Sequence, residues 1–343
     1  MRLRLMRRGP PLLEGEGQGE VCAPSGEDAK RPNDGAVHRE PLPRPVIGWI
    51  PDRLSPTLQA SGKGRRRPGD PSGEVPHLTP TLYVQERGHA RGLLASVAFA
   101  VSAVAAEIPP GERRSGFDAM APETRAMQED DTSNPGMLWV QDGAELWARA
   151  PSADKPACAG CHGAAEAGMR GVAARYPAFD ARSARPMDLQ GRINTCRREH
   201  QGAEPLALEG RDLLSLAAYV ANQSRGLAVA PPADPRLDPA RAQGRALFTA
   251  RMGQLGLSCA ACHDDNHGRR LGSATIPQGH PTGYPLYRLE WQGLGSLGRR
   301  LRNCMTGMRA EPFAAGDPEA IALEAYLMQR AAPLLIETPA VRP

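Results

Sequence analysis

The chain has 343 residues, of which 41% are hydrophobic and 23% charged, and its formal net charge is +4. This positive excess comes entirely from residues 1–91, which carry 15 basic and 11 acidic side chains, while residues 92–343 carry 27 of each. The balance in the longer part excludes an argument from charge for binding to nucleic acid or to a membrane surface, and we expect neither partner.

Residues 1–83 are rich in Arg, Gly and Pro and show no sustained hydrophobic periodicity. The whole chain has three lysines against 39 arginines, which is typical of a GC-rich gene in which reading frames stay open. We expect residues 1–83 to be either a disordered leader or sequence upstream of the true start of translation, which we place near Leu82 or Val84.

Residues 84–106 have the pattern of a secretory signal peptide. The basic residues Arg87 and Arg91 precede an apolar run at 93–104, and the small residues Ala105 and Ala106 follow it. A basic flank, a short apolar core and small residues at the end are the features of a cleaved signal. The run is too short to cross a bilayer. The pattern therefore predicts a periplasmic protein without a membrane-spanning segment.

Two Cys-x-x-Cys-His pentads occupy residues 158–162 and 259–263. In this spacing two thiols reach one edge of a porphyrin to form thioether bonds, and the histidine lies against the iron. The alternative, in which the four pentad cysteines share one zinc ion, leaves both histidines unexplained and joins motifs about 100 residues apart. We therefore predict two covalently bound haem c groups, attached through Cys158, Cys161, Cys259 and Cys262, with His162 and His263 as iron ligands.

The pentads belong to a longer repeat. A Gly-x-x-Leu-aromatic segment precedes each pentad at the same spacing, at 143–147 and 244–248, and an amphipathic segment closes each unit, at 216–220 and 323–327. Four prolines between residues 227 and 239 indicate an extended connection. The repeat predicts a mainly α protein of two tandem class I cytochrome c domains. We place an N-terminal extension at 107–135, the first domain at 136–228, a Pro-rich linker at 229–240 and the second domain at 241–343.

The second axial ligand of each haem carries more functional information. Cys196 and Cys304 occupy equivalent positions in the two repeats, and a thiolate ligand stabilises ferric iron. Met305 and Met308 follow the second pentad at a spacing typical of methionine-ligated carriers, but they have no counterpart in the first repeat. The remaining alternatives are a disulfide between Cys196 and Cys304 and ligation by His200, His267 or His280.

Arginines gather behind the second pentad. Seven of them lie from residue 264 to residue 309, where only three acidic residues oppose them. A solvated helix face accounts for any single arginine, whereas a cluster beside a haem motif indicates a site for a small anion. The members of this cluster are Arg269, Arg270, Arg288, Arg299, Arg300, Arg302 and Arg309.

Several runs resemble a known family. Residues 278–292 (QGHPTGYPLYRLEWQ) and 295–313, together with 133–139 and 171–177, resemble SoxA, the dihaem cytochrome subunit of the SoxAX complex of periplasmic sulfur oxidation. The resemblance covers about residues 113–343 and leaves residues 1–83 outside.

This resemblance implies an L-cysteine S-thiosulfotransferase, which joins thiosulfate oxidatively to a cysteine of the carrier protein SoxYZ. It also implies that electrons leave through the haem of a partner cytochrome, SoxX. By position, the axial ligands are His162 and Cys196 in the first domain and His263 and Cys304 in the second, catalytic domain. Cys304 is then the catalytic cysteine, modified to a persulfide, and Arg300 the substrate-binding residue.

Two other functions stay open on the residues alone. A dihaem electron-transfer cytochrome without sulfur-transfer activity has the same pentads but uses methionine ligands and needs no arginine cluster. A dihaem peroxidase needs one iron with an exchangeable ligand position.

Overall fold

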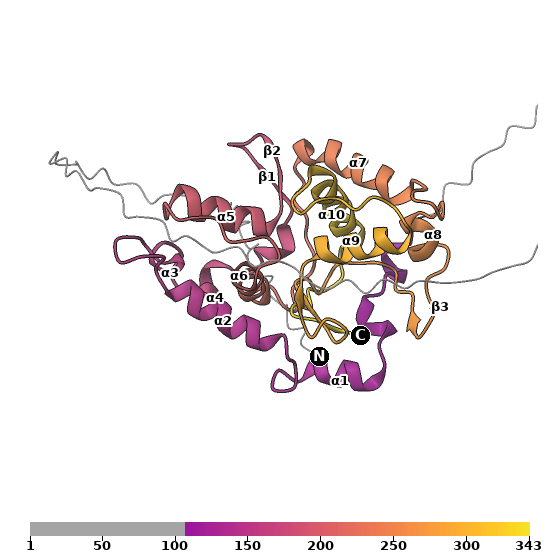
Figure 1. Ribbon diagram of the computed structural model, residues 1–343, viewed down its shortest axis with the longest axis horizontal. Helices are drawn as coiled ribbons and strands as arrows, with labels where there is room; N and C mark the ends of the chain where they lie inside the picture. Colours follow the sequence, from indigo (N-terminus) through magenta and orange to yellow (C-terminus); the bar gives the residue numbers. More distant parts are fainter. Residues whose placement is uncertain (1–106) are drawn as a thin grey trace, which may run out of the picture. The chain divides into compact units, whose positions relative to one another are not determined.

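In the computed structural model, residues 107–343 are described (Figure 1), and the predicted leader and signal peptide lie outside them. These residues form two helical domains in succession, and each begins with a long helix, turns through a pentad and ends with a long helix. The predicted mainly α repeat is confirmed. Across residues 107–343, no helix is long and apolar enough to cross a membrane.

The first domain places its pentad between a long N-terminal helix and a small hairpin. The pentad forms one short helix, and the hairpin strands pair antiparallel, with Phe179 opposite Pro186. The elements are α2 (Met137–Ala148), α3 (Cys158–His162), α4 (Ala165–Gly168), η3 (Ala173–Arg175), β1 (Ala178–Asp180), β2 (Arg185–Met187), α5 (Leu189–Glu199) and α6 (Arg211–Asn222).

The second domain repeats this order and adds strands. The C-terminal strand β7 joins the central hairpin, since it pairs parallel with β5 while β6 pairs antiparallel on the other side. The elements are η4 (Pro235–Leu237), α7 (Asp238–Thr249), α8 (Cys259–His263), β3 (Arg270–Leu271), β4 (Ala274–Thr275), β5 (Leu286–Arg288), β6 (Gly293–Gly295), α9 (Leu297–Gly307), α10 (Pro318–Ala331) and β7 (Val341–Arg342).

A glycine at each helix crossing lets the first and last helices of a domain touch backbone to backbone. A Cβ added at Gly143 of α2 would lie 2.2 Å from the carbonyl oxygen of Ser215 in α6. A Cβ at Gly244 of α7 would lie 2.1 Å from the carbonyl oxygen of Ala322 in α10. The repeated glycines therefore set the same close crossing in both domains.

The repeated aromatic residues pack beside these crossings. The rings of Trp147 and Tyr219 meet edge to face at 6.0 Å in the first domain, and those of Phe248 and Tyr326 lie 5.5 Å apart in the second. Phe248 is 1% exposed. These side chains belong to the two apolar cores that surround the pentad helices.

The predicted linker is packed against both domains. The backbone N–H of Val229 donates to the carbonyl of Leu334 at 2.8 Å, and that of Ala230 to the carbonyl of Ala174 at 3.0 Å. Val229 also joins a buried cluster with Ala174 and Met328. The extended stretch is shorter than residues 229–240, because η4 and the start of α7 lie inside that range.

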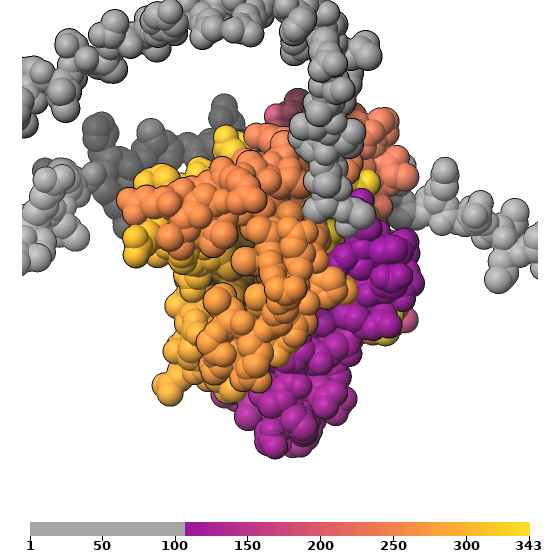
Figure 2. Space-filling model, turned by 90° about the vertical axis from the view of Figure 1, so that its right-hand side faces the viewer, coloured from indigo at the N-terminus to yellow at the C-terminus, as the bar shows by residue number. Residues whose placement is uncertain are grey.

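The N-terminal extension braces the second domain. It contains η1 (Pro110–Glu112), η2 (Gly116–Ala119) and α1 (Pro122–Glu129), and it lies against the second domain in the space-filling view (Figure 2). The side-chain oxygen of Gln128 accepts from the backbone N–H of Val341 at 3.1 Å. The extension therefore ties the C-terminal strand to the rest of the domain.

Candidate haem sites

The second domain encloses a cavity of about 490 Å³ that brings the predicted ligands together. Cys259 and His263 of α8 lie on its wall, and so do Arg300 and Cys304 of α9. Apolar side chains form a large part of the remaining wall, among them Phe248, Leu286, Leu297, Leu301, Leu323 and Leu327. We call this space the second-domain cavity.

His263 is held in the form that a metal ligand needs. Its Nδ1 lies 2.7 Å from the carbonyl oxygen of Pro277. Because a carbonyl only accepts, Nδ1 carries the proton and Nε2 keeps its lone pair. Burial lowers the pKa of His263, which favours the neutral ring. Gly279, at φ +78°, lies against this ring, and a Cβ there would come within 2.9 Å of the imidazole.

Helix α9 supplies the other side of the cavity. Ser296 caps the helix by accepting from the backbone N–H of Arg299 at 3.0 Å. Arg300 and Cys304 lie four residues apart and share one face, and both line the cavity. Met305 and Met308 are buried, at 6% and 8% exposure, and neither lines it. The helix therefore presents a cysteine rather than a methionine to the cavity that His263 also lines.

The residues of this cavity fit a covalently bound haem c. Burial, and next the nearby Cys304, raise the pKa of the Cys259 thiol to about 11, so its surroundings disfavour an anionic sulfur. An uncharged thioether suits such a position. Cys259 and Cys262 would attach the haem, His263 would bind the iron on one face and Cys304 on the other.

The structure divides the predicted arginine cluster. Arg270, Arg288 and Arg300 line the cavity, and Arg342 of β7 joins them, although sequence spacing gave no reason to select it. Arg299, which stacks on Trp291 at 4.1 Å, does not line it. The other members, Arg269, Arg302 and Arg309, also lie outside the lining.

The positive charge of Arg300 is not balanced by a neighbouring carboxylate among residues 107–343. Within residues 107–343, no carboxylate lies at ion-pair distance from Arg300, whereas Arg288 pairs with Glu290 at 3.1 Å and Arg342 pairs with Glu337 at 2.8 Å. Burial, and next the charge of Arg300, lower the pKa of Arg288. Arg300 is therefore a cation suited to an anion inside the cavity.

The first domain holds its pentad differently. The His162 ring lies 5.7 Å from that of Trp147, whose Nε1 donates to the carbonyl of Gly163 at 3.0 Å. Burial lowers the pKa of His162 and raises that of Cys158. The free thiols Cys158 and Cys161 precede the histidine on the same short helix. This donor set fits a second haem.

Cys196 stands on α5 at the position equivalent to Cys304. Cys196 is disulfide-bonded, whereas Cys304 is free. A disulfide between Cys196 and Cys304 is therefore wrong. Ligation of the first iron by Cys196 stays a prediction.

Among the alternative ligands, His200 and His267 are exposed, and Nδ1 of His267 lies 2.8 Å from the carbonyl of Asp264. His280 is buried and lines the second-domain cavity, and its Nε2 lies 3.3 Å from the side-chain oxygen of Gln278. Burial lowers the pKa of His280 to about 3. A shared zinc site is wrong, because no three His, Cys, Asp or Glu side chains of residues 107–343 gather to hold a metal ion.

Comparison with known proteins identifies relatives of the chain. The family model "SoxA/TsdA, cytochrome c domain" matches residues 142–229 and again 243–334. The SoxA subunit of L-cysteine S-thiosulfotransferase from Pseudaminobacter salicylatoxidans is 37% identical over 235 residues, which cover 68% of this chain and 82% of that protein. The SoxA subunit from Rhodovulum sulfidophilum is 36% identical over 231 residues, 67% of this chain and 80% of the relative.

A solved structure is also similar. The crystal structure of SoxXA from P. pantotrophus contains a chain that superposes with a TM-score of 0.65 at 32% sequence identity. The match covers 67% of this chain and 87% of that chain. The described part of the molecule thus has its two repeated domains and their order in common with a solved relative.

Proposed function

The chain belongs to the SoxA/TsdA cytochrome c family, and we propose that it joins thiosulfate oxidatively to a cysteine of a carrier protein of the SoxYZ kind. The observation that carries this proposal is the meeting of Arg300, Cys304 and His263 on one cavity. Together they offer a sulfur that can form an S–S bond, a cation for the thiosulfate anion and a ligand for the haem that would accept electrons.

We assign two covalently bound haem c groups to the chain. Cys158 and Cys161 attach the first, with His162 and Cys196 as axial ligands. The second is attached through Cys259 and Cys262. His263 of α8 and Cys304 of α9, which both line the cavity, would serve as ligands of its iron. The free thiols of both pentads and the acceptor at Nε2 of His263 support this assignment.

Arg300 binds the sulfonate end of thiosulfate in this proposal. A guanidinium offers paired donors that match two sulfonate oxygens, and it stays charged at every relevant pH. Its position one helical turn before Cys304 holds the outer sulfur of thiosulfate near the cysteine sulfur.

The sulfur chemistry balances if Cys304 carries a persulfide. Thiosulfate joins the outer sulfur of Cys304, one S–S bond forms and two electrons leave. The carrier thiolate then attacks the thiosulfate sulfur, that bond breaks, and the Cys304 persulfide is restored. Haem c supplies a one-electron acceptor for the electrons that leave. The carrier ends with a thiosulfonate group and has lost its thiol proton.

The two domains have unequal roles in this account. Arg192 stands four residues before Cys196, as Arg300 does before Cys304, but its guanidinium donates to Asp180 at 2.6 Å. That pair is buried, with side-chain exposures of 17% and 8%. Substrate binding therefore belongs to the second domain.

A partner cytochrome of the SoxX kind receives the electrons, and the protein works in the periplasm. The solved relative is titled as a SoxXA complex, which supports the partner. The periplasmic assignment follows from the haem c pentads and from the signal pattern at residues 84–106.

The test is thiosulfate-dependent reduction of the haem, followed by absorption spectroscopy in the purified complex with its partner cytochrome. We expect continued reduction over many turnovers to need both thiosulfate and a carrier with a free thiol, because without the carrier the adduct on Cys304 is not discharged and reduction stops after one turnover. Alkylation of the carrier thiol should have the same effect as omitting the carrier. Reduction that continues beyond one turnover equally well without the carrier, or no response to thiosulfate, would overturn the proposal in favour of an electron-transfer cytochrome.

A further inference from the structure

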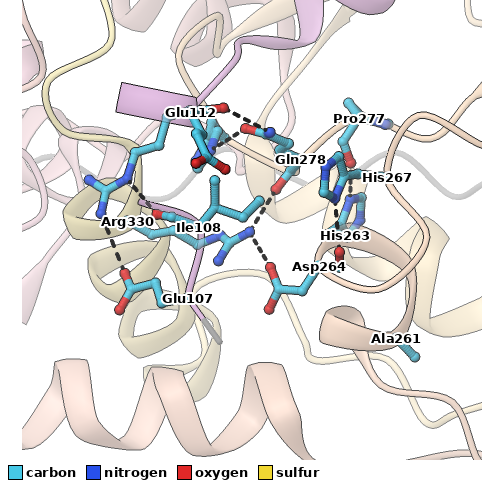
Figure 3. A network of polar contacts seen from close by, with 12 residues as sticks. Glu107, Ile108, Glu112, Ala261, His263, Asp264, His267, Pro277, Gln278 and Arg330 are labelled. Carbon is cyan, nitrogen blue, oxygen red and sulfur yellow. Dashed lines mark hydrogen bonds and ion pairs between the residues drawn. The ribbon is translucent and has the colours of Figure 1, made fainter. Parts of the chain in front are cut away.

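A buried arginine lies behind the histidine of the second-domain cavity. Arg330 of α10 is 1% exposed, and its ion pair with Asp264 is almost fully withdrawn from solvent, with side-chain exposures of 1% and 8%. The same terminal nitrogen that donates to the Asp264 carboxylate also donates to the carbonyl of Gln278 at 3.2 Å. Figure 3 shows these contacts beside His263.

Arg330 contacts two residues that directly follow, in the chain, the donor and the acceptor of one hydrogen bond. Asp264 directly follows His263, and Gln278 directly follows Pro277, whose carbonyl accepts from Nδ1 of His263 at 2.7 Å. One guanidinium nitrogen of Arg330 thus contacts both Asp264 and Gln278. We propose that Arg330 is a positioning residue that fixes the His263 ring against the iron of the second haem through Asp264 and Gln278.

Stability does not account for this arrangement. A fully buried ion pair loses in desolvation much of what its attraction supplies. Nε and the second terminal nitrogen of Arg330 find no hydrogen-bond partner among residues 107–343, which adds to the cost. The remaining favourable contact of the guanidinium is with the ring of Phe248, whose centroid lies 4.9 Å from the central guanidinium carbon. A costly buried charge of this kind is explained by the geometry that it imposes.

The acceptor segment is held from a second direction by the N-terminal extension. The side-chain oxygen of Gln278 accepts from the backbone N–H of Arg114 at 2.6 Å, and its side-chain nitrogen donates to the carbonyl of Glu112 at 3.1 Å. Arg113 donates to the carbonyl of Ala332, just beyond α10. The extension and α10 therefore brace the same short segment behind His263.

The contacts of Arg330 with Asp264 and Gln278, which we call the clamp, have no counterpart in the first domain. Counting from the pentads, the position of Asp264 is taken by Gly163, and counting from the repeated tyrosines, the position of Arg330 is taken by Gln223. Within residues 107–343, no hydrogen bond from the His162 ring to a carbonyl is present. The clamp therefore distinguishes the domain that holds Arg300 and Cys304 from its duplicate.

Preorganisation of the axial bond gives the clamp a function. A histidine whose ring orientation is fixed keeps its bond to iron while electrons and the opposite ligand change, and hydrogen bonds behind a ligand tune the metal. The inference rests on the proposed haem of the second domain but is independent of sulfur transfer, so the two can fail separately.

The test uses the full-length holoprotein, with Arg330→Met removing the clamp and Asp264→Asn removing the charge while keeping the shape. Asp180→Asn, which breaks the buried pair of the first domain, is the matched control. Electron paramagnetic resonance of the ferric protein reads each haem, and the signal that changes in Cys304→Ala identifies the second. Rates of cyanide binding at that iron and the melting temperature complete the set.

We expect Arg330→Met and Asp264→Asn to shift the signal of the second haem and to speed its cyanide binding at least tenfold, while the first haem is unchanged. Asp180→Asn should lower the melting temperature without altering the second haem, and Arg330→Lys should restore part of the native signal. If the Arg330→Met protein cannot be produced in folded form, the spectra and cyanide rates of Asp264→Asn alone test the clamp. Unchanged signals and cyanide rates in loaded variants that melt earlier would overturn the clamp, whereas wild-type protein with no haem in the second domain would overturn the proposed function.

Discussion

Arg300 lies one helical turn before Cys304 on α9, and both side chains line the cavity that also contains His263. The same spacing exists between Arg192 and Cys196 on α5, but there the arginine is neutralised by a buried aspartate. The repeat thus kept the sequence spacing in both domains and left the free guanidinium in only one. This difference separates the proposed substrate site from its duplicate.

Replacing Arg300 tests the anion site. Removing hydrogen bonds from a charged donor to a charged ligand costs about 1.5–3 kcal/mol, so Arg300→Ala should lower kcat/KM for thiosulfate about ten- to a hundredfold. Arg300→Lys should recover only part of it, because a lysine keeps the charge but not the paired donors. Steady-state kinetics of the three proteins measure this.

Arg302→Ala is the matched control, since Arg302 lies on the same helix, pairs with Glu209 at 3.5 Å and does not line the second-domain cavity. Its kinetics should equal those of the wild type. Unchanged kinetics for Arg300→Ala would contradict the anion site. A changed potential of the second haem in that variant would instead indicate a contact between Arg300 and a haem propionate.

Replacing the methionines tests the identity of the distal ligand. Met305 and Met308 are buried but do not line the cavity. Met305→Leu and Met308→Leu conserve volume, which costs less than about 1.5 kcal/mol, so both should keep the absorption and paramagnetic resonance spectra of the wild type. Loss of the low-spin signal of the second haem in either variant would show that methionine, and not Cys304, binds that iron.

Gly244→Ala tests the helix crossing. The new Cβ meets a backbone oxygen of α10 at 2.1 Å, so no side-chain rotation relieves the clash and the helices must separate. Overpacking of this kind costs about 1–3 kcal/mol, and the melting temperature should fall by several degrees. In the control, Gly307→Ala on the exposed end of α9, nothing lies within 4 Å, so stability should hold or rise slightly. Equal melting temperatures for both variants would refute the argument.

Stability should fall as the pH rises, because of a carboxyl pair in a second cavity, of about 470 Å³, between the two domains. Asp188, the N-cap of α5, and Glu324 of α10 both line this interdomain cavity. Burial raises the pKa of Asp188 and of Glu324, and the charge of Asp188 adds to the rise, bringing the pKa of Glu324 to about 8. The pair therefore retains a proton at neutral pH that the unfolded chain has lost.

The sign of the effect follows from proton binding. Between the ordinary pKa of 4.5 and about 8, the folded state binds more protons than the unfolded state, so stability decreases with rising pH and levels off above about 8. Glu324→Gln should leave the melting temperature at pH 5 unchanged and raise it at pH 8.5. A wild-type melting temperature that does not decline between pH 5 and pH 8 would rule out the retained proton.

The pentads and the repeat predict both the haem-attachment helices and the chain order, because these features depend on local spacing and on helical periodicity. Cys304 followed from its equivalence to Cys196 in the repeat, whereas the role of Arg300 was implied by the family resemblance. Their four-residue separation on a helix predicts a common face. Trp147 and Phe248, the aromatic residues of the repeated segments, both lie in the cores.

Contacts between residues far apart in the chain leave no pattern of spacing or periodicity in the sequence. Arg342 reaches the cavity only because β7 pairs with β5, and Arg330 meets Asp264 across 66 residues of chain. The neutralisation of Arg192 likewise depends on the hairpin that carries Asp180. One clue to Arg330 was present: it is a charged residue four positions after Tyr326 on the buried stripe of α10.

The most direct test of the central claim is the intact mass of the carrier protein after incubation with thiosulfate, oxidant and the complex carrying Cys304→Ala or Cys196→Ala. We expect the wild type and Cys196→Ala to add a thiosulfate group to the carrier, and Cys304→Ala, with its second haem still attached through Cys259 and Cys262, to add none. A carrier that gains the same mass at the wild-type rate from Cys304→Ala would contradict the assignment of the reaction to this cysteine.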